Sequence, residues 1–218
     1  MNSILDQVTT VLKRWIVPTA FWPRKRVVLP DLTIELWVCQ RKLPMLLRAD
    51  AIVVPTAPDL KMVFGIAKMV RDMGADAVQY EANAVAPLEP GDAFVGTGAK
   101  FRYKYTALTV IFDESKRTSA AFISESLAAA MRKLREKGAR SVVVPDYTEN
   151  LLTQPNWITT EQRQQTAAIT SRLLVDAILT AGSNVKTVRI WVWDPANASY
   201  YVAELDRLKK NGRQAVTA

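Results

Sequence analysis

The chain has 218 residues, 49% of them hydrophobic, and a formal net charge of +8, a composition that allows a sizeable core and excludes a disordered or fibrous protein. It contains no histidine, which excludes Ser-His-Asp and Cys-His nucleophilic sites and removes the usual ligand of zinc and iron. A single cysteine excludes an internal disulfide, and no stretch reaches the roughly 18 uninterrupted apolar residues that would cross a bilayer.

Residues 1–25 are predicted to form an N-terminal amphipathic helix followed by a basic arm. Apolar residues recur at helical spacing: Ile4, Val8, Val11, Leu12 and Trp15. Pro18 ends the helix, and residues 21–26 combine aromatic residues with three cations. Packing on the chain's own domain or on a sister subunit, docking on a membrane surface, and contact with nucleic acid all remain open for this arm.

The next part of the chain predicts five strands and one helix. Alternating apolar residues predict strands over 26–29 and 32–39, the second with a buried thiol at Cys39. Residues 50–54 predict a fully buried strand, and residues 62–82 a helix with Gly74 near its end. Strands follow over 93–96 and 108–112. Between them three cations alternate with aromatic residues, which suits either single-stranded nucleic acid or a hairpin with one buried face; we favour the hairpin.

The last part predicts helices and buried strands in alternation. A helix over 119–137 ends at Gly138, a strand covers 142–144, and Thr159 with Gln162 caps a helix to about residue 180. A strand over 188–192 and a helix over 199–210 follow. Helices and strands in this order predict a three-layer α/β/α sandwich, with a mixed, mostly parallel sheet of about six strands over residues 26–210 and a flexible tail over 211–218.

Several of these segments resemble the macro domain, the ADP-ribose-binding or Appr-1-p processing module, over about residues 30–208. Residues 50–53, Asp-Ala-Ile-Val, resemble the strand that opens its binding loop. Residues 88–93, Leu-Glu-Pro-Gly-Asp-Ala, resemble its Pro/Thr-Gly-Glu-Ala turn, and residues 138–145 the strand before its second loop. Residues 188–208 resemble its last strand and helix. The N-terminal domain of leucine aminopeptidases, which shares this core, is a related possibility.

The resemblance implies a ligand crevice between the loops at residues 55–65 and 145–150. Its ligand-binding residues in this chain would be Gln40, Pro55, Thr56, Ala57, Asp59, Gly65, Pro145, Asp146, Tyr147, Thr148, Trp193 and Asp194. Tyr147 or Trp193 would stack on a ring, and Gln40 would stand where the family places the carboxylate that reads adenine. Asp59 and Asp146 suit helix N-caps and, alternatively, a hard cation.

The chain departs from the family pattern in the loops that carry the family's catalytic and phosphate-binding residues. The family's Asn-Ala-Ala-Asn run is matched by residues 54–57, Val-Pro-Thr-Ala, and its glycine-rich stretch keeps only Gly65. The second loop reads Asp-Tyr-Thr-Glu-Asn over residues 146–150. A diphosphate would therefore meet Asp59, Asp146 and Glu149 in place of a glycine nest, and like charges disfavour an anion. We expect weak or altered nucleotide binding and no glycohydrolase turnover.

Three functions follow from these observations. The first is a divergent macro-like module that binds an ADP-ribose-like or other nucleotide ligand. The second is an assembly protein that uses residues 2–17 to self-associate, to bind a protein or to dock on a membrane surface. The third is a carboxylate- or metal-dependent phosphoester hydrolase using Asp59, Asp146 or Asp194. We expect no cofactor, a cytoplasmic location, and weak association of the basic residues with nucleic acid or anionic membranes.

Overall fold

The computed structural model describes residues 23–38, 47–97, 102–151, 159–181 and 184–215. The predicted N-terminal helix, Cys39 and Gln40 lie outside these residues. No helix in the described ranges is long and apolar enough to span a membrane.

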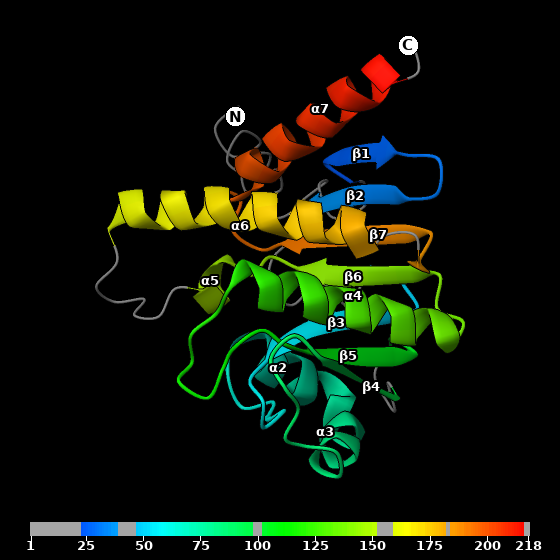
Figure 1. Ribbon diagram of the computed structural model, residues 1–218, viewed down its shortest axis with the longest axis vertical. Coiled ribbons are helices and arrows are strands. Elements are labelled where there is room, and N and C mark those ends of the chain that lie inside the picture. Colours follow the sequence, from blue (N-terminus) through cyan, green and yellow to red (C-terminus); the bar gives the residue numbers. More distant parts are fainter. Residues whose placement is uncertain (1–22, 39–46, 98–101, 152–158, 182–183, 216–218) are drawn as a thin grey trace, which may run out of the picture.

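A seven-stranded sheet in the order β1-β2-β7-β6-β3-β5-β4 forms the centre of the molecule (Figure 1). The strands are β1 Lys25–Val28, β2 Thr33–Val38, β3 Ala51–Thr56, β4 Ala93–Thr97, β5 Tyr105–Val110, β6 Ser141–Pro145 and β7 Thr187–Val192. Each pair of neighbours from β2 to β5 runs parallel, whereas β1 and β4 pair antiparallel at the two edges. The expected mixed, mostly parallel sheet is confirmed, with seven strands where about six were predicted.

Helices cover both faces of the sheet, as the α/β/α prediction requires. α4 Ala120–Glu136, α6 Thr160–Ala181 and α7 Ala198–Ala215 lie on one face, and Figure 1 shows α4 and α6 crossing it. α2 Gly65–Val70, the π-helical turn η3 Arg71–Ala75 and α3 Asp76–Asn83 pack on the other face. α7 continues to Ala215, five residues beyond the predicted end of the last helix.

Two hydrophobic cores form because successive side chains of a strand point to opposite faces. On β3, Ala51 and Val53 join the core under α4, α6 and α7, whereas Ile52 and Val54 join the core under α2 and α3. All six residues of β3 are buried. A continuous apolar run without alternation is what a central strand covered on both faces requires.

Side chains cap two of the long helices, and the cap by Thr159 and Gln162 is the one that the sequence predicts. The Ser119 hydroxyl accepts a hydrogen bond from the Phe122 amide at 3.1 Å. Thr159 and Gln162 form a reciprocal capping box, with each backbone N–H donating to the other's side chain at 3.0 and 3.2 Å. Gly138, at φ +81°, ends α4 in a Schellman motif, in which the Gly138 and Ala139 amides donate to the Arg135 and Leu134 carbonyls.

The prediction of one continuous helix over residues 62–82 is wrong in two places. Gly74 adopts φ 114°, a left-handed conformation that breaks the helix between α2 and α3. Residues 60–64 form a loop, because the Gln79 side chain replaces helical hydrogen bonds there. It accepts from the Met62 amide at 2.6 Å and donates to the Leu60 carbonyl at 3.3 Å.

The strand that follows the basic and aromatic segment begins at Tyr105, three residues before its predicted start. Tyr103 is fully buried, whereas Arg102 and Lys104 are exposed. β4 and β5 are antiparallel neighbours. The expectation of a hairpin with one buried and one solvated face is therefore confirmed over its described part.

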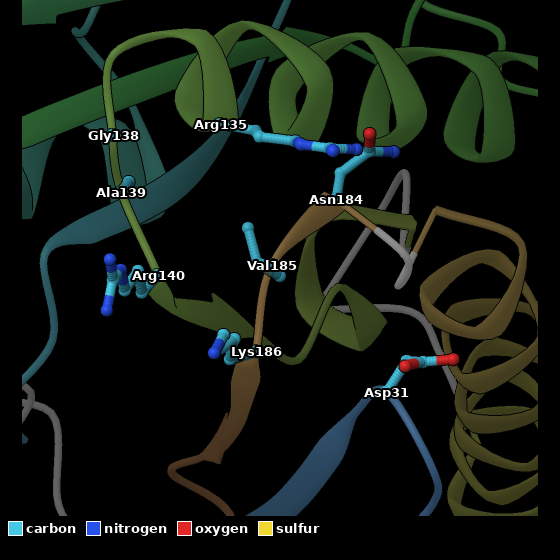
Figure 2. Close-up of a pocket in the computed structure, with 8 residues that line it drawn as sticks. All are labelled: Asp31, Arg135, Gly138, Ala139, Arg140, Asn184, Val185 and Lys186. Carbon is cyan, nitrogen blue, oxygen red and sulfur yellow. The ribbon is translucent and has the colours of Figure 1, made fainter.

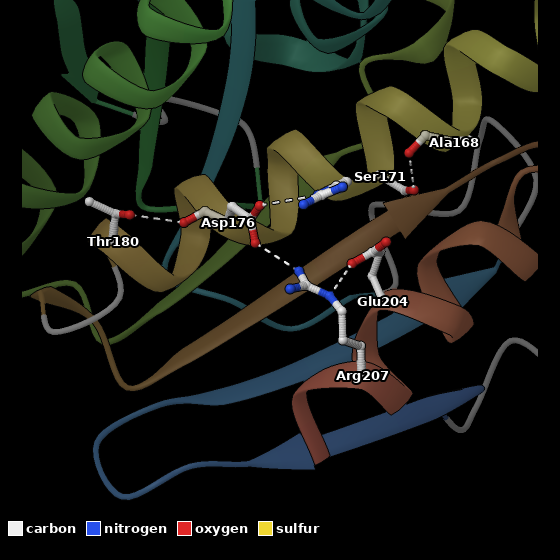
Figure 3. A network of polar contacts seen from close by, with 7 residues as sticks. Ala168, Ser171, Asp176, Thr180, Glu204 and Arg207 are labelled. Atoms are coloured by element: carbon white, nitrogen blue, oxygen red, sulfur yellow. Dashed lines mark hydrogen bonds and ion pairs between the residues drawn. The ribbon is translucent and has the colours of Figure 1, made fainter. Parts of the chain in front are cut away.

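Ion pairs attach α7 to its neighbours. Figure 3 shows Arg207 of α7 between Asp176 of α6 and Glu204 of its own helix, at 2.9 and 2.7 Å. Lys25 of β1 pairs with Asp206 of α7, and Arg26 lies 3.5 Å from Glu35 of β2. α7 is thereby linked both to α6 and to the edge strand β1.

Candidate functional site

Most predicted site residues follow the carboxyl ends of parallel strands, which meet at one edge of the sheet. In open α/β sheets ligands bind at this edge. Pro55 and Thr56 end β3, and Ala57 and Asp59 follow it. Pro145 ends β6 and is followed by Asp146, Tyr147 and Thr148, and Trp193 and Asp194 follow β7. Gly65 begins α2.

A cleft of about 600 Å³ opens between the loop after β3 and the loop after β5. Four predicted residues line it: Pro55, Thr56, Ala57 and Asp59. Three cations, Lys61, Lys116 and Arg117, and the apolar residues Val63, Phe64 and Phe112 also line it. The volume falls within the roughly 300–1,000 Å³ of small-molecule sites.

The cleft walls have an excess of positive charge. Against the three cations stands one lining carboxylate, Asp59, which lies 3.4 Å from the Lys61 ammonium. The Arg117 guanidinium lies 3.1 Å from Asp113, whose pKa is lowered by the hydrogen bond from the Arg117 amide and by the charge of the same residue. Lys116 has no ion-pair partner among the described residues. It is therefore the cation most available to an anionic ligand.

Unusual backbone conformations border the cleft on both sides. In the described chain Leu60 and Lys116 are the two non-glycine residues with positive φ, at 53° and 59°, and Gly65 adopts φ 51°. Hydrogen bonds between Asp113 and residues 116–117 hold the Lys116 turn: the Lys116 amide donates to the Asp113 carbonyl at 2.9 Å. Left-handed backbone at a non-glycine residue costs about 1–2 kcal/mol and is found preferentially at functional sites.

Thr56 forms part of the floor of the cleft and is 4% exposed. Its hydroxyl donates to the Thr109 carbonyl of β5 at 3.2 Å, and its own carbonyl accepts from the Ile111 amide at 3.2 Å. These bonds fix the end of β3, from which the loop starts, to β5 and to the residue that follows β5. Gly65 itself begins α2 and does not line the cleft, although Phe64 beside it does, with a side chain that is 78% exposed.

The second predicted loop turns inward and does not face the cleft. Asp146 is 1% exposed and accepts four hydrogen bonds: from the Thr148 amide at 3.0 Å and hydroxyl at 2.6 Å, Asn197 Nδ2 at 2.8 Å and the Tyr201 hydroxyl at 2.8 Å. It thus starts the short helix α5 Thr148–Leu151, which is the helix-capping role considered for it. Burial, then the charge of Asp146, raises the pKa of Tyr201 well above its usual value, so its hydroxyl stays a donor.

The expectation that Tyr147 stacks on a ligand is wrong for this structure. Its ring is 1% exposed, packed in the core beneath α4, α6 and α7. Its hydroxyl lies 3.4 Å from that of Thr109, and burial raises its pKa despite that contact. Pro145 and Thr148 are buried as well. These residues support the sheet edge and offer no surface to a ligand.

Trp193 and Asp194 follow β7, away from the cleft lining. The Trp193 ring lies 5.4 Å from that of Trp191, with the planes inclined by 59°. Asp194 accepts from the Ala196 amide at 2.9 Å and thereby forms the turn into α7. The structure thus brings together four of the predicted residues, Pro55, Thr56, Ala57 and Asp59, and places the other described ones elsewhere.

No shared carboxylate centre links the three aspartates of the hydrolase hypothesis. Asp59 lines the cleft, Asp146 is enclosed and Asp194 shapes a turn. In the part of the chain that the structure describes, no group of three Asp, Glu or Cys residues could hold a metal ion.

Sequence reasoning missed Phe112, Lys116 and Arg117 as cleft residues. The available signal was the cation pair that follows a predicted strand, residues 108–112, by a few positions. This signal places the two cations beside the loop after β3 only if that strand, β5, is known to pair directly with β3. The sheet order alone shows this pairing.

Comparisons with known proteins agree with this fold. Residues 53–149 match the family described as the Macro domain. No curated protein matches the chain. Among solved structures, the Oceanobacillus iheyensis macrodomain with ADP superimposes with a TM-score of 0.69 at 13% identity, covering 86% of this chain and 97% of its own. The Trypanosoma brucei macrodomain in complex with ADP-ribose gives 0.59 at 12%, covering 77% and 67%. At these identities the likeness shows the fold.

Proposed function

Because the chain carries a macro domain, we propose that the cleft between the loops after β3 and β5 binds a nucleotide ligand of the ADP-ribose type. Solved macrodomains of similar fold are described with ADP and with ADP-ribose. The family match over residues 53–149 includes both loops that form the cleft.

One observation carries the proposal: cations and apolar rings share one cleft at the carboxyl edge of the sheet. Lys61, Lys116 and Arg117 supply donors for phosphate oxygens, and charge-assisted hydrogen bonds of this kind are about twice as strong as neutral ones. Phe64 and Phe112 supply apolar surface for a base or a ribose. A ligand with both a phosphate and a ring system matches this combination better than a phosphate alone.

The same residues support binding without hydrolysis. The positions that resemble the family's Asn-Ala-Ala-Asn run carry no amide side chain, and the Thr56 hydroxyl among them is engaged with the Thr109 carbonyl. Asp59, the lining carboxylate, is paired with Lys61. We therefore expect no release of ADP-ribose from a mono-ADP-ribosylated protein, and steady release would overturn this half of the proposal.

Lys116 provides a sharp test, because asparagine tolerates its left-handed backbone while the substitution removes the ammonium group. Isothermal titration and thermal shift with ADP-ribose, ADP and ribose 5-phosphate should show saturable binding that raises the melting temperature of the full chain. Lys116→Asn should weaken ADP-ribose binding roughly tenfold, the loss of one charged hydrogen bond.

Lys209→Asn is the matched control, since Lys209 is exposed on α7. It should bind like the unaltered chain. The proposal fails if no adenine nucleotide binds, or if both variants bind ADP-ribose as tightly as the unaltered chain.

A further inference from the structure

The opposite edge of the sheet, where the parallel strands begin, carries a row of exposed cations. Strand register aligns Ala51 with Tyr105 and Val142, and Thr187 with Ser141 and Thr33. Residues just before these strands therefore lie side by side. They include Arg48, Arg102, Lys104, Arg140 and Lys186, all exposed. Arg135 and Lys137 at the carboxyl end of α4 add two more exposed cations.

Few carboxylates oppose these seven cations. Asp31, Asp50 and Glu136 lie on the same edge. Asp50 is engaged by the backbone, because its carboxylate accepts from the Arg140 and Ser141 amides at 2.8 and 2.9 Å and from the Ser141 hydroxyl at 2.9 Å. Arg135, Arg140 and Lys186 form no ion pair with any described residue. The edge therefore keeps a positive excess of four charges, counting seven cations and three carboxylates.

A hollow of about 440 Å³ lies within this row. Figure 2 shows it between the carboxyl end of α4 and the loops before β6 and β7, with Arg135, Arg140, Asn184 and Lys186 around it and Asp31 extending away from the cations. Gly138 contributes open space, because a Cβ there would meet no atom within 4 Å. The hollow is large enough for a phosphate group and its neighbouring sugar.

The length of this row of cations indicates that its ligand is a polymer with several phosphates and not a single phosphate. Neighbouring strands are about 4.8 Å apart, so the cations that precede β7, β6, β3 and β5 span roughly 14 Å. The aromatic residues of this edge are occupied: Tyr103 is buried, and the Tyr105 ring lies under Lys104 at 5.1 Å and Lys137 at 6.0 Å. None of the described rings on this edge is open for base stacking, so contact with the phosphate backbone is favoured over base reading.

We propose that the amino-end edge of the sheet binds the phosphate backbone of a nucleic acid without reading its sequence, and that the hollow between Arg135, Arg140 and Lys186 holds one of its phosphates. This proposal is independent of the nucleotide cleft on the opposite edge. Backbone binding of this type is governed by release of counterions, and its affinity therefore falls steeply with salt.

Fluorescence anisotropy tests the proposal. A labelled 20-nucleotide RNA of mixed sequence is titrated with the full chain at 50–300 mM salt. We expect a dissociation constant of about 1–100 μM near physiological salt. Arg135→Gln/Arg140→Gln/Lys186→Gln should weaken binding at least tenfold at 100 mM salt. It should also reduce the slope of log K against log salt by about 2, because each phosphate contact on a single strand contributes roughly 0.7.

Lys68→Gln/Lys209→Gln/Lys210→Gln is the matched control, since it removes three exposed cations from α2 and α7. It should retain the slope of the unaltered chain. Lys186→Gln alone should lose about 0.7 of the slope, which keeps the test decisive if the triple variant does not fold. A uridine homopolymer should bind within about threefold of the mixed RNA.

Four results would overturn the proposal: no binding of the unaltered chain at 50 mM salt, equal losses in the two triple variants, unchanged binding by the edge variant, or a strong preference for one RNA sequence. Vesicles with 30% phosphatidylserine form a separate arm. If they bind through the same three cations while RNA does not, the partner is a membrane surface and the proposal is wrong.

Discussion

Asp146 is a candidate catalytic or ligand-binding residue in the sequence, but its role in the fold is structural. Its carboxylate, 1% exposed, joins β6, α5 and α7 by accepting from Thr148, Asn197 and Tyr201. No cation pairs with it among the described residues, so hydrogen bonds alone compensate for its burial. Such a carboxylate is strongly stabilising only while every donor stays in place.

Replacing one carboxylate oxygen of Asp146 by an amide should therefore destabilise the fold. Asp146→Asn leaves at least one buried donor, the Tyr201 hydroxyl or the Asn197 amide, without an acceptor, and should cost about 2 kcal/mol of unfolding free energy. Urea denaturation measures this loss. Asp194→Asn, which can still accept the Ala196 hydrogen bond, should cost less than about 0.5 kcal/mol. Equal losses in the two variants would contradict this account of Asp146.

Among the elements, the segment from α2 to α3 differs most from its sequence pattern. The apolar stripe over residues 62–82 is correct as a pattern of burial, since Met62, Ile66 and Val70 all enter one core. The periodicity does not show that Gly74 breaks the helix. Nor does it show that the Gln79 side chain forms hydrogen bonds with the backbone of the loop before α2. Both depend on tertiary contacts that a local pattern does not contain.

Gly74→Ala distinguishes the broken helix from a continuous one by the sign of its effect. In a continuous helix alanine would stabilise the protein by about 1 kcal/mol. At φ 114° it should instead destabilise by about 1–2 kcal/mol, because a Cβ is strained in this conformation. Thermal or urea unfolding gives the sign directly, and a gain in stability would show that the break is absent in solution.

The helix ends, by contrast, are well predicted because capping is local chemistry. Gly138 and the Thr159–Gln162 pair are read from residue type and spacing alone, and each has the expected hydrogen bonds. The candidate site is predicted less well. The loop after β3 was found because it follows a buried strand, whereas Lys116 and Arg117 depend on which strands are neighbours, and the burial of Tyr147 depends on three helices packing over it.

For the molecule as a whole, the absence of histidine predicts a flat response to pH near neutrality. Burial tends to raise the pKa of Asp50, but hydrogen bonds from Arg140 and Ser141 outweigh it and lower the pKa. For Asp92, the Lys133 hydrogen bond and the Ala93 amide likewise outweigh burial. A lowered pKa in the folded state stabilises the protein above the unfolded-state value of about 3.9, and that stability is lost as the pH falls through the folded-state pKa.

The unfolding free energy should therefore stay constant from pH 7 to pH 5 and fall below pH 4. Urea titrations at pH 7, 5 and 3 measure it. Asp50→Asn should reduce the loss between pH 5 and 3, because this group no longer takes up a proton on unfolding. A fall between pH 7 and 5 would mean that a group outside the acidic residues controls stability.

The position of β1 in the sheet has a consequence for how the molecule opens. β3 lies at the centre, buried in all six residues and paired on both sides, whereas β1 has four residues and one neighbour. Ion pairs of Lys25 and Arg26 supplement its few backbone bonds, and salt weakens such pairs. We therefore expect local unfolding to begin at β1, with its amides exchanging with solvent hydrogen before those of β3 and with added salt widening this difference.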